Sequence, residues 1–183
     1  MYRLFVAVDL PEEVRTAVAA IGGELGGARR VPADQLHLTL RFIGEADEKL
    51  FAAIKAALTG VSGSTFPLSL SGVGHFPPGK HPRVLWVGME ASEALLNLQQ
   101  AVELALAGVG ITPDERRFAP HITIARLKDT PPAAVLALEE RHRRFASVPF
   151  QVTEFYLYSS VLTREGAIHR REAAYPLRSP ANP

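Results

Sequence analysis

A five-residue pattern, in which a histidine and a threonine alternate with apolar residues, occurs twice in this chain. It reads Leu-His-Leu-Thr-Leu at residues 36–40 and Pro-His-Ile-Thr-Ile at residues 120–124, an offset of 84 (121 − 37). Each copy lies in a stretch of β-forming residues and follows a stretch in which apolar residues have helical spacing. Such a repeat predicts two lobes of like architecture that face each other across a cleft.

The spacing of apolar residues indicates which elements surround the two copies. Steps of three and four residues predict helices over residues 11–25, 48–58, 92–106 and 132–143. β-Forming composition predicts strands over residues 3–8, 36–43, 66–73, 84–87, 121–125, 150–159 and 167–176. The connections at 74–82 and 160–166 are too short for a crossover helix, so the strands that they join are antiparallel. The expected fold class is α+β, with two mostly antiparallel sheets flanked by helices and a central cleft.

Composition narrows the chemistry that the chain can carry out. It contains no cysteine, which excludes thiol nucleophiles, disulfides, iron–sulfur clusters and cysteine-ligated zinc. A formal net charge of +1 is too small for a protein that coats nucleic acid through a dense basic face. Arginines cluster at residues 29–30, 116–117, 141–144 and 170–171, and most of these are interpreted as solvated surface charge.

The first residues and the apolar runs bear on where the protein works. Residues 1–10 lack the features of a signal or transit peptide, and no apolar run reaches the roughly 18 residues of a membrane-spanning helix. We therefore expect a cytoplasmic protein that does not enter a membrane. Residues 1–177 are expected to form a single domain of two lobes, and residues 178–183, which include two prolines, a disordered tail.

Alternation along a strand gives each copy of the pattern one polar face. His37 and Thr39 point to one side of their strand, and His121 and Thr123 do the same on theirs. Two imidazoles can supply a general base and a general acid near neutral pH, because one can be neutral while the other is protonated. Threonine hydroxyls can donate hydrogen bonds to the non-bridging oxygens of a phosphate as charge builds up on them. These groups suit the cleavage of a phosphodiester without a metal.

The paired H-x-T-x motifs resemble those of a known superfamily. His37-Leu38-Thr39-Leu40 and His121-Ile122-Thr123-Ile124 look like the motifs of the two-histidine (2H) phosphoesterases. Longer stretches at residues 1–10, 37–44, 83–88 and 118–126 resemble the bacterial and archaeal LigT-like branch, the RNA 2′,3′-cyclic phosphodiesterases. The similarity extends to about residue 177.

The resemblance implies a bilobal fold with pseudo-twofold symmetry and with the two motifs on central strands. It implies hydrolysis of a 2′,3′-cyclic phosphate at an RNA end, tRNA fragments included, to a 2′-phosphate without a metal or other cofactor. Members of this branch are also described as joining tRNA halves through a 2′,5′ linkage. By carry-over, His37 is the proton donor to the leaving 3′ oxygen and His121 the proton acceptor from water. We expect the protein to be a monomer.

Residues just beyond the two motifs are further candidates. The family pattern has a phosphate-binding basic residue at Arg126, although strict alternation puts Arg126 on the face opposite His121 unless a bend or bulge intervenes. Related enzymes stack the nucleobase at the position of Phe42, for which core packing is the alternative interpretation. Arg41 has the right parity to share the face of His37.

The sequence leaves other functions open. One is a binding module of the same fold that holds a nucleotide or RNA phosphate without turning it over. A second is a hydrolase of a small nucleotide cyclic phosphate, and a third is a ligase that works mainly in the 2′,5′-joining direction. The motifs do not separate a hydrolase from a ligase, because both act on the same cyclic phosphate.

The remaining histidines and aromatic residues have two interpretations each. A zinc site would need His37, His121 and a third histidine, but no metal-binding spacing supports one. His75 and His81 flank a turn expected near the rim of the cleft, and the other histidines are His142 on a helix and His169 in a late strand. We expect Trp86, Tyr156 and Tyr158 either to line the cleft or to pack in the core.

Overall fold

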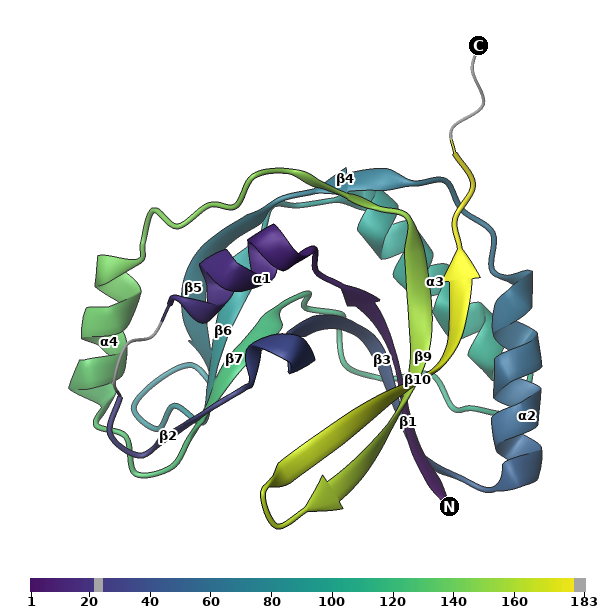
Figure 1. The fold of residues 1–183 in the computed structure, drawn as a ribbon, viewed down its shortest axis with the longest axis horizontal. Coiled ribbons are helices and arrows are strands. Elements are labelled where there is room, and N and C mark those ends of the chain that lie inside the picture. The colour runs from purple at the N-terminus through teal and green to yellow at the C-terminus, as the bar shows by residue number, and fades with distance from the viewer. Residues whose placement is uncertain (22–24, 180–183) are drawn as a thin grey trace.

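The computed structural model describes residues 1–21 and 25–179, and these form two four-stranded sheets (Figure 1). The first sheet has the order β10-β9-β1-β3, the second has the order β2-β7-β6-β5, and neighbouring strands run antiparallel. The strands are β1 (Tyr2–Asp9), β2 (Ala28–Arg30), β3 (His37–Ala46), β4 (Phe66–Leu68), β5 (Leu70–Phe76), β6 (Val84–Met89), β7 (Ile122–Leu127), β8 (Phe150–Val152), β9 (Glu154–Thr163) and β10 (Gly166–Pro176). The predicted α+β class with two mostly antiparallel sheets is confirmed.

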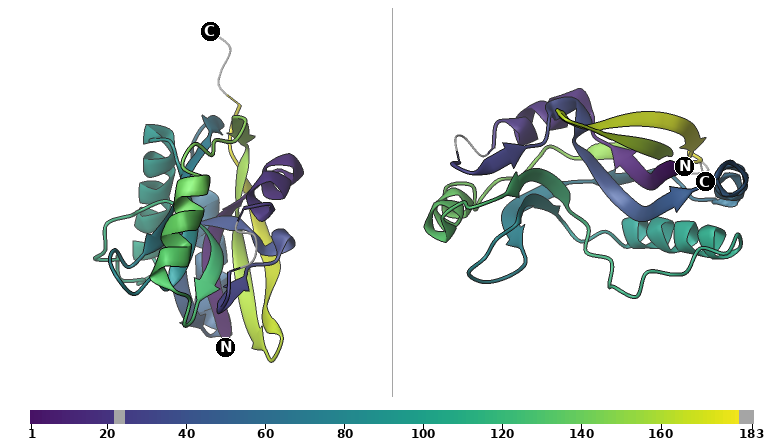
Figure 2. Two further views of the ribbon diagram at one scale, coloured as in Figure 1. Left: turned by 90° about the vertical axis from the view of Figure 1, so that its left-hand side faces the viewer. Right: turned by 90° about the horizontal axis from the view of Figure 1, so that it is seen from below.

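Helices flank both sheets (Figures 1 and 2). They are α1 (Glu12–Ala19), α2 (Glu48–Ala57), α3 (Glu93–Ala107) and α4 (Pro132–Arg141), with the 3₁₀ turns η1 (Ala33–Gln35) and η2 (Leu58–Gly60). α2 and α3 pack against β3, whereas α4 packs against β5. Asp47 and Ser92 cap α2 and α3, because their side chains accept hydrogen bonds from backbone N–H groups of the first turn at 2.8 and 3.1 Å. No helix in the described part of the chain is long and apolar enough to cross a bilayer.

The 84-residue offset of the two motifs extends to the elements around them. α4 begins 84 residues after α2 (132 − 48), β8 begins 84 after β4 (150 − 66), and β9 begins 84 after β5 (154 − 70). β4 and β8 pair with each other, Phe66 opposite Val152 and Leu68 opposite Phe150, so the offset maps this pair onto itself. β5 then joins the sheet of β6 and β7, and β9 joins the sheet of β1 and β3. The two lobes are therefore related by a pseudo-twofold axis through the β4–β8 pair.

Apolar residues anchor both motif strands in the core. Leu38, Leu40, Ile122 and Ile124 are each at most 5% exposed and belong to one buried cluster. Truncating a buried side chain of this size costs about 2–5 kcal/mol. These anchors therefore determine which side of each strand faces the cleft.

Some predicted boundaries differ from the structure. The strands predicted over 66–73 and 150–159 are each divided, at Ser69 and Thr153, into a short strand of the β4–β8 pair and a long strand of a sheet. The sequence did not predict β2, because its three residues include two arginines and show no alternation of apolar and polar side chains. The helix predicted over 11–25 ends at Ala19, and residues 22–24 lie outside the described part of the chain.

Backbone pairing continues one residue beyond the predicted domain boundary at 177. Arg178 forms a parallel bridge with Ser64. Its N–H donates to the carbonyl of Gly63 at 2.9 Å, and its carbonyl accepts from Thr65 at 2.9 Å. The first residue of the predicted disordered tail is therefore paired, whereas residues 180–183 lie outside the described residues.

β3 contains one extra residue directly after Thr39. Ala7 of β1 pairs with Thr39, and the preceding residue Val6 pairs with Arg41, so Leu40 is a β-bulge. A bulge reverses the alternation of the side chains beyond it. Arg41 therefore shares the sheet face of Val6, which is fully buried, and not the face of Thr39.

Arg41 consequently joins β3 to α3. Its guanidinium donates hydrogen bonds to both carboxylate oxygens of Glu103, at 2.7 and 2.8 Å, and to the carbonyl of Thr112 at 2.7 Å. The prediction that Arg41 shares the face of His37 is wrong, because the bulge at Leu40 shifts the alternation by one residue.

We expect Arg41→Met to lower the free energy of unfolding by about 2 kcal/mol, because it leaves the half-buried carboxylate of Glu103 without its charged donors. Arg143→Met is the matched control, since Arg143 pairs with Glu140 at 3.6 Å on an exposed surface and such pairs contribute about 0.3–0.5 kcal/mol. Urea unfolding followed by circular dichroism measures both losses. Equal losses in the two variants would contradict the structural role of Arg41.

Candidate active site

The main chain holds both motif histidines in the same way. Nδ1 of His37 lies 2.6 Å from the carbonyl oxygen of Gln35, and Nδ1 of His121 lies 2.8 Å from that of Ala119. A carbonyl oxygen only accepts hydrogen bonds, so each Nδ1 carries a proton and donates it. In the neutral ring, Nε2 is then the nitrogen with the lone pair. Each imidazole is therefore set to exchange a proton through Nε2.

The two histidines lie within electrostatic reach of each other. The strands that present them, β3 and β7, pack against one another near the centre of the molecule (Figures 1 and 2). Burial lowers the pKa of His37 from its ordinary value, the hydrogen bond to Gln35 and the charge of Asp9 raise it, and the charge of His121 lowers it. The net direction is down, so His37 in the free protein binds its proton less tightly than an exposed histidine.

An aromatic ring supports each histidine. Phe5 of β1 stacks on His37 with the ring centres 4.9 Å apart, and Phe76 of β5 meets His121 edge to face at 5.0 Å. Phe76 also packs on Trp86, with the ring centres 5.3 Å apart. These contacts restrict the rotation of both imidazoles.

A third histidine, His169 of β10, lies against His37. The two rings meet edge to face, with their centres 5.3 Å apart. Burial lowers the pKa of His169, and the charge of His37 lowers it further, whereas Asp34 raises it. The side-chain amide of Gln35 donates to the carbonyl of Ala167 at 2.5 Å and so holds β10 here. The sequence placed His169 in a late strand but did not predict its contact with His37, because it lies 132 positions from His37 (169 − 37) and has no threonine two positions on.

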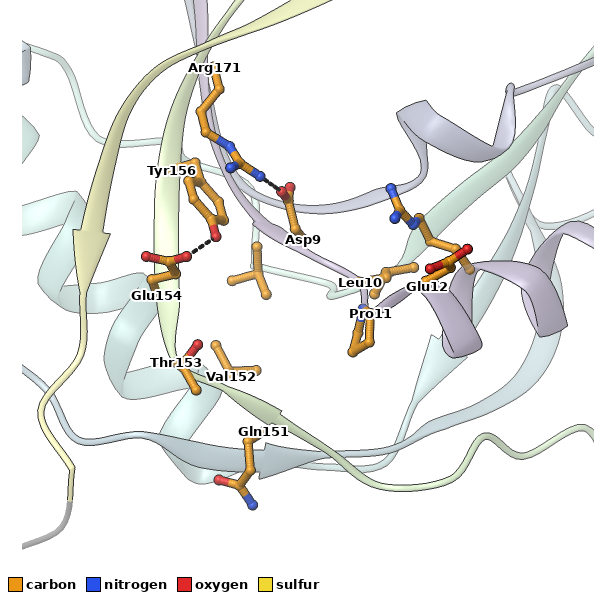
Figure 3. A pocket seen from close by; sticks show the side chains of 12 residues that line it. Asp9, Leu10, Pro11, Glu12, Gln151, Val152, Thr153, Glu154, Tyr156 and Arg171 are labelled. Atoms are coloured by element: carbon orange, nitrogen blue, oxygen red, sulfur yellow. Dashed lines mark hydrogen bonds and ion pairs between the residues drawn. The ribbon is translucent and has the colours of Figure 1, made fainter.

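Asp9 is the centre of a charged cluster beside His37. The Tyr158 hydroxyl donates to it at 2.6 Å, and Arg171 forms an ion pair with it (Figure 3). Burial and the hydrogen bond to Asp9 raise the pKa of Tyr158 to about 12. A cavity of about 200 Å³ is lined by Asp9, Arg15, His37, Tyr158, His169 and Arg171. A second cavity, of about 310 Å³, shares Asp9, Arg15 and Arg171 with the first (Figure 3).

The surroundings differ among the three aromatic residues that were expected either in the cleft or in the core, Trp86, Tyr156 and Tyr158. The Trp86 indole lies over Gly74, where an added methyl group would come within 2.3 Å of ring carbon Cζ2. Tyr158 faces the site, with its ring centre 6.4 Å from that of His37. Tyr156 is 6% exposed, and the Arg171 guanidinium lies 3.9 Å from its ring centre.

Thr39 and Thr123 occupy matching places on the two sheets. Thr39 lies opposite Ala7 of β1, and Thr123 lies opposite Trp86 of β6. Both side chains are half-buried, and neither hydroxyl makes a hydrogen bond to another described residue. Each hydroxyl is therefore available to a group in the cleft.

The bulge of β3 is repeated in β7. Trp86 of β6 pairs with Thr123, and Val84 pairs with Arg126. Trp86 and Val84 are two residues apart, whereas Thr123 and Arg126 are three apart, so Ile124 is a β-bulge. The bulge that brings Arg126 to the face of His121 is therefore present. The Arg126 side chain is exposed there.

Phe42 lies on the face of His37, because the bulge at Leu40 turns it there. It pairs with Phe5, whose ring stacks on His37. Phe42 is 48% exposed, and the guanidinium of Arg3 lies 5.2 Å from its ring centre. The core-packing interpretation of Phe42 is therefore wrong.

The remaining histidines lie away from the pair. His75 lies in β5, one residue before the turn that it was expected to flank. Its Nδ1 contacts the carboxylate of Glu139 in α4. His81 lies between β5 and β6, and His142 directly follows α4. Among residues 1–21 and 25–179, no three or more histidine, aspartate or glutamate side chains are grouped so as to hold a metal ion. The zinc alternative therefore lacks a ligand set there.

Comparison with known proteins gives one family for most of the chain. The family described as the 2′-5′ RNA ligase superfamily matches residues 10–164. The RNA 2′,3′-cyclic phosphodiesterase of Archaeoglobus fulgidus is 36% identical over 174 residues, which is 92% of this chain and 96% of that protein. The protein of the same name from Thermotoga maritima is 34% identical over 174 residues, with 92% and 91% covered.

Solved structures of similar proteins show the same fold. The Thermus thermophilus protein TT0787 aligns with a TM-score of 0.79 at 31% identity, over 97% of this chain and 98% of that one. LigT of E. coli complexed with 3′-AMP aligns with a TM-score of 0.74 at 28% identity, over 96% and 98%. The chain thus belongs to the 2′-5′ RNA ligase superfamily, the two-histidine phosphoesterases that its paired motifs predicted.

Proposed function

We propose that this protein is an RNA 2′,3′-cyclic phosphodiesterase that opens the cyclic phosphate at an RNA end to a 2′-phosphate. The observation that carries the proposal is the matched pair of imidazoles, each with Nδ1 bound to a main-chain carbonyl and Nε2 left for proton transfer. The relatives named RNA 2′,3′-cyclic phosphodiesterase support the substrate class. His37 and His121 supply both proton transfers, so the proposed reaction uses no metal or other cofactor.

In the proposed mechanism, His121 accepts a proton from the attacking water, and His37 donates one to the leaving 3′ oxygen. The water oxygen bonds to phosphorus while the bond from phosphorus to the 3′ oxygen breaks, which leaves the phosphate on the 2′ oxygen. His37 begins protonated and ends neutral, and His121 does the reverse, so proton exchange with solvent restores the pair.

The phosphate of the bound substrate favours the protonated form of His37, the proposed general acid. Burial lowers the pKa of His37 in the free protein, whereas the charge of Asp9 raises it. A bound phosphate adds a second negative charge beside the ring and favours the imidazolium further. His37 is then protonated when the substrate is in place and gives its proton up readily.

The flanking side chains complete the proposed substrate site. The hydroxyls of Thr39 and Thr123 donate to the non-bridging oxygens, where charge develops in the transition state. The Arg126 guanidinium adds positive charge on the side of His121. The exposed ring of Phe42, on the side of His37, stacks the terminal base, and such a contact contributes about 1–3 kcal/mol.

The proposed substrates are RNA ends with a cyclic phosphate, tRNA fragments among them. The proposed enzyme is a cytoplasmic monomer that forms one domain of two lobes. Joining of RNA ends through a 2′,5′ linkage is a second candidate activity, because the 5′ hydroxyl of another RNA can take the place of water as the group that His121 deprotonates. The description of the matching family as 2′-5′ RNA ligases favours this second activity.

Replacement of either motif histidine is expected to remove the reaction. In His37→Ala and His121→Ala, kcat on an oligoribonucleotide that ends in a 2′,3′-cyclic phosphate falls by about 10²–10⁴-fold, because each change deletes one proton transfer. His142→Ala, which removes a histidine outside the cleft, keeps the wild-type kcat. The assay contains EDTA, and chromatography resolves the 2′-phosphate from the 3′-phosphate product.

Three results would contradict the proposal. A folded wild-type protein that binds the oligonucleotide without converting it would indicate a binding module. Conversion that requires added zinc would contradict the metal-independent mechanism. Turnover of nucleoside cyclic phosphates but of no oligonucleotide would indicate a small-molecule hydrolase.

The hydroxyl role predicts a difference between two threonine substitutions. Thr39→Val and Thr123→Val each lower kcat by about 10²-fold with little change in KM, because the hydrogen bond strengthens in the transition state. Thr39→Ser and Thr123→Ser keep the hydroxyl and most of the activity. Steady-state kinetics on the same oligonucleotide measures all four, and equal losses for valine and serine would argue against donation by the hydroxyl.

The surroundings of His37 predict pKa shifts of opposite sign. The pKa of His37 in the free protein is lower than its ordinary value. His121→Gln raises this pKa because it removes a neighbouring positive charge, and Asp9→Asn lowers it because it removes a negative charge. NMR titration of the imidazole Cε1 proton gives the midpoints, and shifts of the same sign would refute this electrostatic account.

A further inference from the structure

Two arginines face each other on neighbouring strands of the second sheet. Arg29 of β2 pairs directly with Arg126 of β7, and both side chains are exposed (Figure 1 shows β2 beside β7). No carboxylate among the described residues forms an ion pair with either one. Like charges directly opposite each other on paired strands are destabilising. The fold therefore holds two adjacent cations without the compensation that an ion pair gives.

Nearby arginines are paired and so differ from these two. Arg30 donates to the carbonyl of Ile21 at 2.8 Å, at the end of α1. Arg41 binds Glu103, and Arg171 binds Asp9. Arg30 is thus an exposed arginine that also caps a helix, which leaves the place of Arg29 beside Arg126 to be explained.

Arg29 lies on the cleft side of its sheet. Its partner Arg126 pairs with Val84, Val84 pairs with Phe76, and the ring of Phe76 lies against His121. Paired residues of antiparallel strands share a face, so Arg29 is on the face of His121.

Arg29 also reaches the other lobe. A methyl group added at Gly166, the first residue of β10, would lie 3.1 Å from an Nη atom of Arg29. Three residues further along β10, His169 lies against His37. The Arg29 guanidinium therefore lies between the sheet face of His121 and the strand that carries His169.

We infer that Arg29, next to Arg126, binds the phosphodiester that links the terminal nucleotide to the preceding one in the RNA. The inference rests on the proposed function and extends it to a preference for RNA over single nucleotides. The reacting phosphate is proposed to lie between His37 and His121, whereas Arg29 is on the edge strand β2, one strand beyond β7. Because the cyclic phosphate occupies the 3′ end, the nearest other phosphate of the substrate is on the 5′ side. An anion between Arg29 and Arg126 would also offset their repulsion.

The test compares two substrates that differ in this phosphate. A nucleoside 2′,3′-cyclic phosphate lacks it, and a diribonucleotide that ends in a 2′,3′-cyclic phosphate contains it. We expect Arg29→Ala to raise KM for the diribonucleotide by about five- to tenfold, as for the loss of a charged hydrogen bond. KM for the nucleoside 2′,3′-cyclic phosphate is expected to change by less than about twofold. Arg29→Lys keeps the charge and is expected to lie between wild type and Arg29→Ala.

Arg116→Ala is the matched control, because it also removes one exposed arginine, one that pairs with Asp114 outside the cleft. It is expected to leave both KM values unchanged. The KM advantage of the diribonucleotide in the wild type is expected to shrink as salt rises, since the contact is ionic.

Three outcomes would overturn the inference. Equal losses on both substrates would mean that Arg29 acts by holding the start of β10, and no loss on either would mean that it binds no phosphate. A wild type that hydrolyses neither substrate would refute the proposed function, and the inference with it.

Discussion

The extra residue after the threonine of each motif strand determines which side chains reach the cleft. If Leu40 and Ile124 were paired regularly instead of bulged out, alternation would turn Phe42 and Arg126 to the buried face and bring Arg41 to the cleft. With the bulges, Arg41 joins β3 to a helix of the core instead. Phe42 and Arg126 are themselves 84 positions apart (126 − 42). Phe42, which is proposed to stack the base, and Arg126, which is proposed to bind phosphate, therefore occupy equivalent positions in the two lobes.

The histidines share a tautomer, so their roles must come from their surroundings. Both Nδ1 atoms donate to a carbonyl two residues earlier, and each ring rests against a phenylalanine. Only His37 has Asp9 and His169 as neighbours in the cavity beside it. Asp9 favours the protonated ring, whereas burial and the charge of His121 oppose it. This balance suits a proton donor that is charged when the phosphate is bound and releases its proton afterwards.

The parts of this protein that could be predicted from sequence depend on short-range periodicity. Helices over 48–58, 92–106 and 132–143 match α2, α3 and α4 to within two residues, because their apolar stripes are regular. The shared face of histidine and threonine needs only the two-residue period of a strand. The bulges leave no mark in the apolar pattern, so Arg41 was placed on the wrong face. His169 depends on the pairing of β10 with β9 and of β9 with β1, which a local pattern does not contain.

The same distinction separates what the repeat supplies from what it does not. The strands β9-β1-β3 and β5-β6-β7 are the equivalent triplets that carry the two motifs, and each sheet has one further strand. In the first sheet it is β10, which brings His169 to the face of His37. In the second it is β2, which brings Arg29 beside Arg126. A symmetric pair of imidazoles can move protons in either direction, so an added strand on each side is what makes the two ends of the cleft chemically different. The strand that places His169 against His37 and the strand proposed to bind the RNA chain are therefore the parts of the fold in which specificity can change while the paired motifs stay the same.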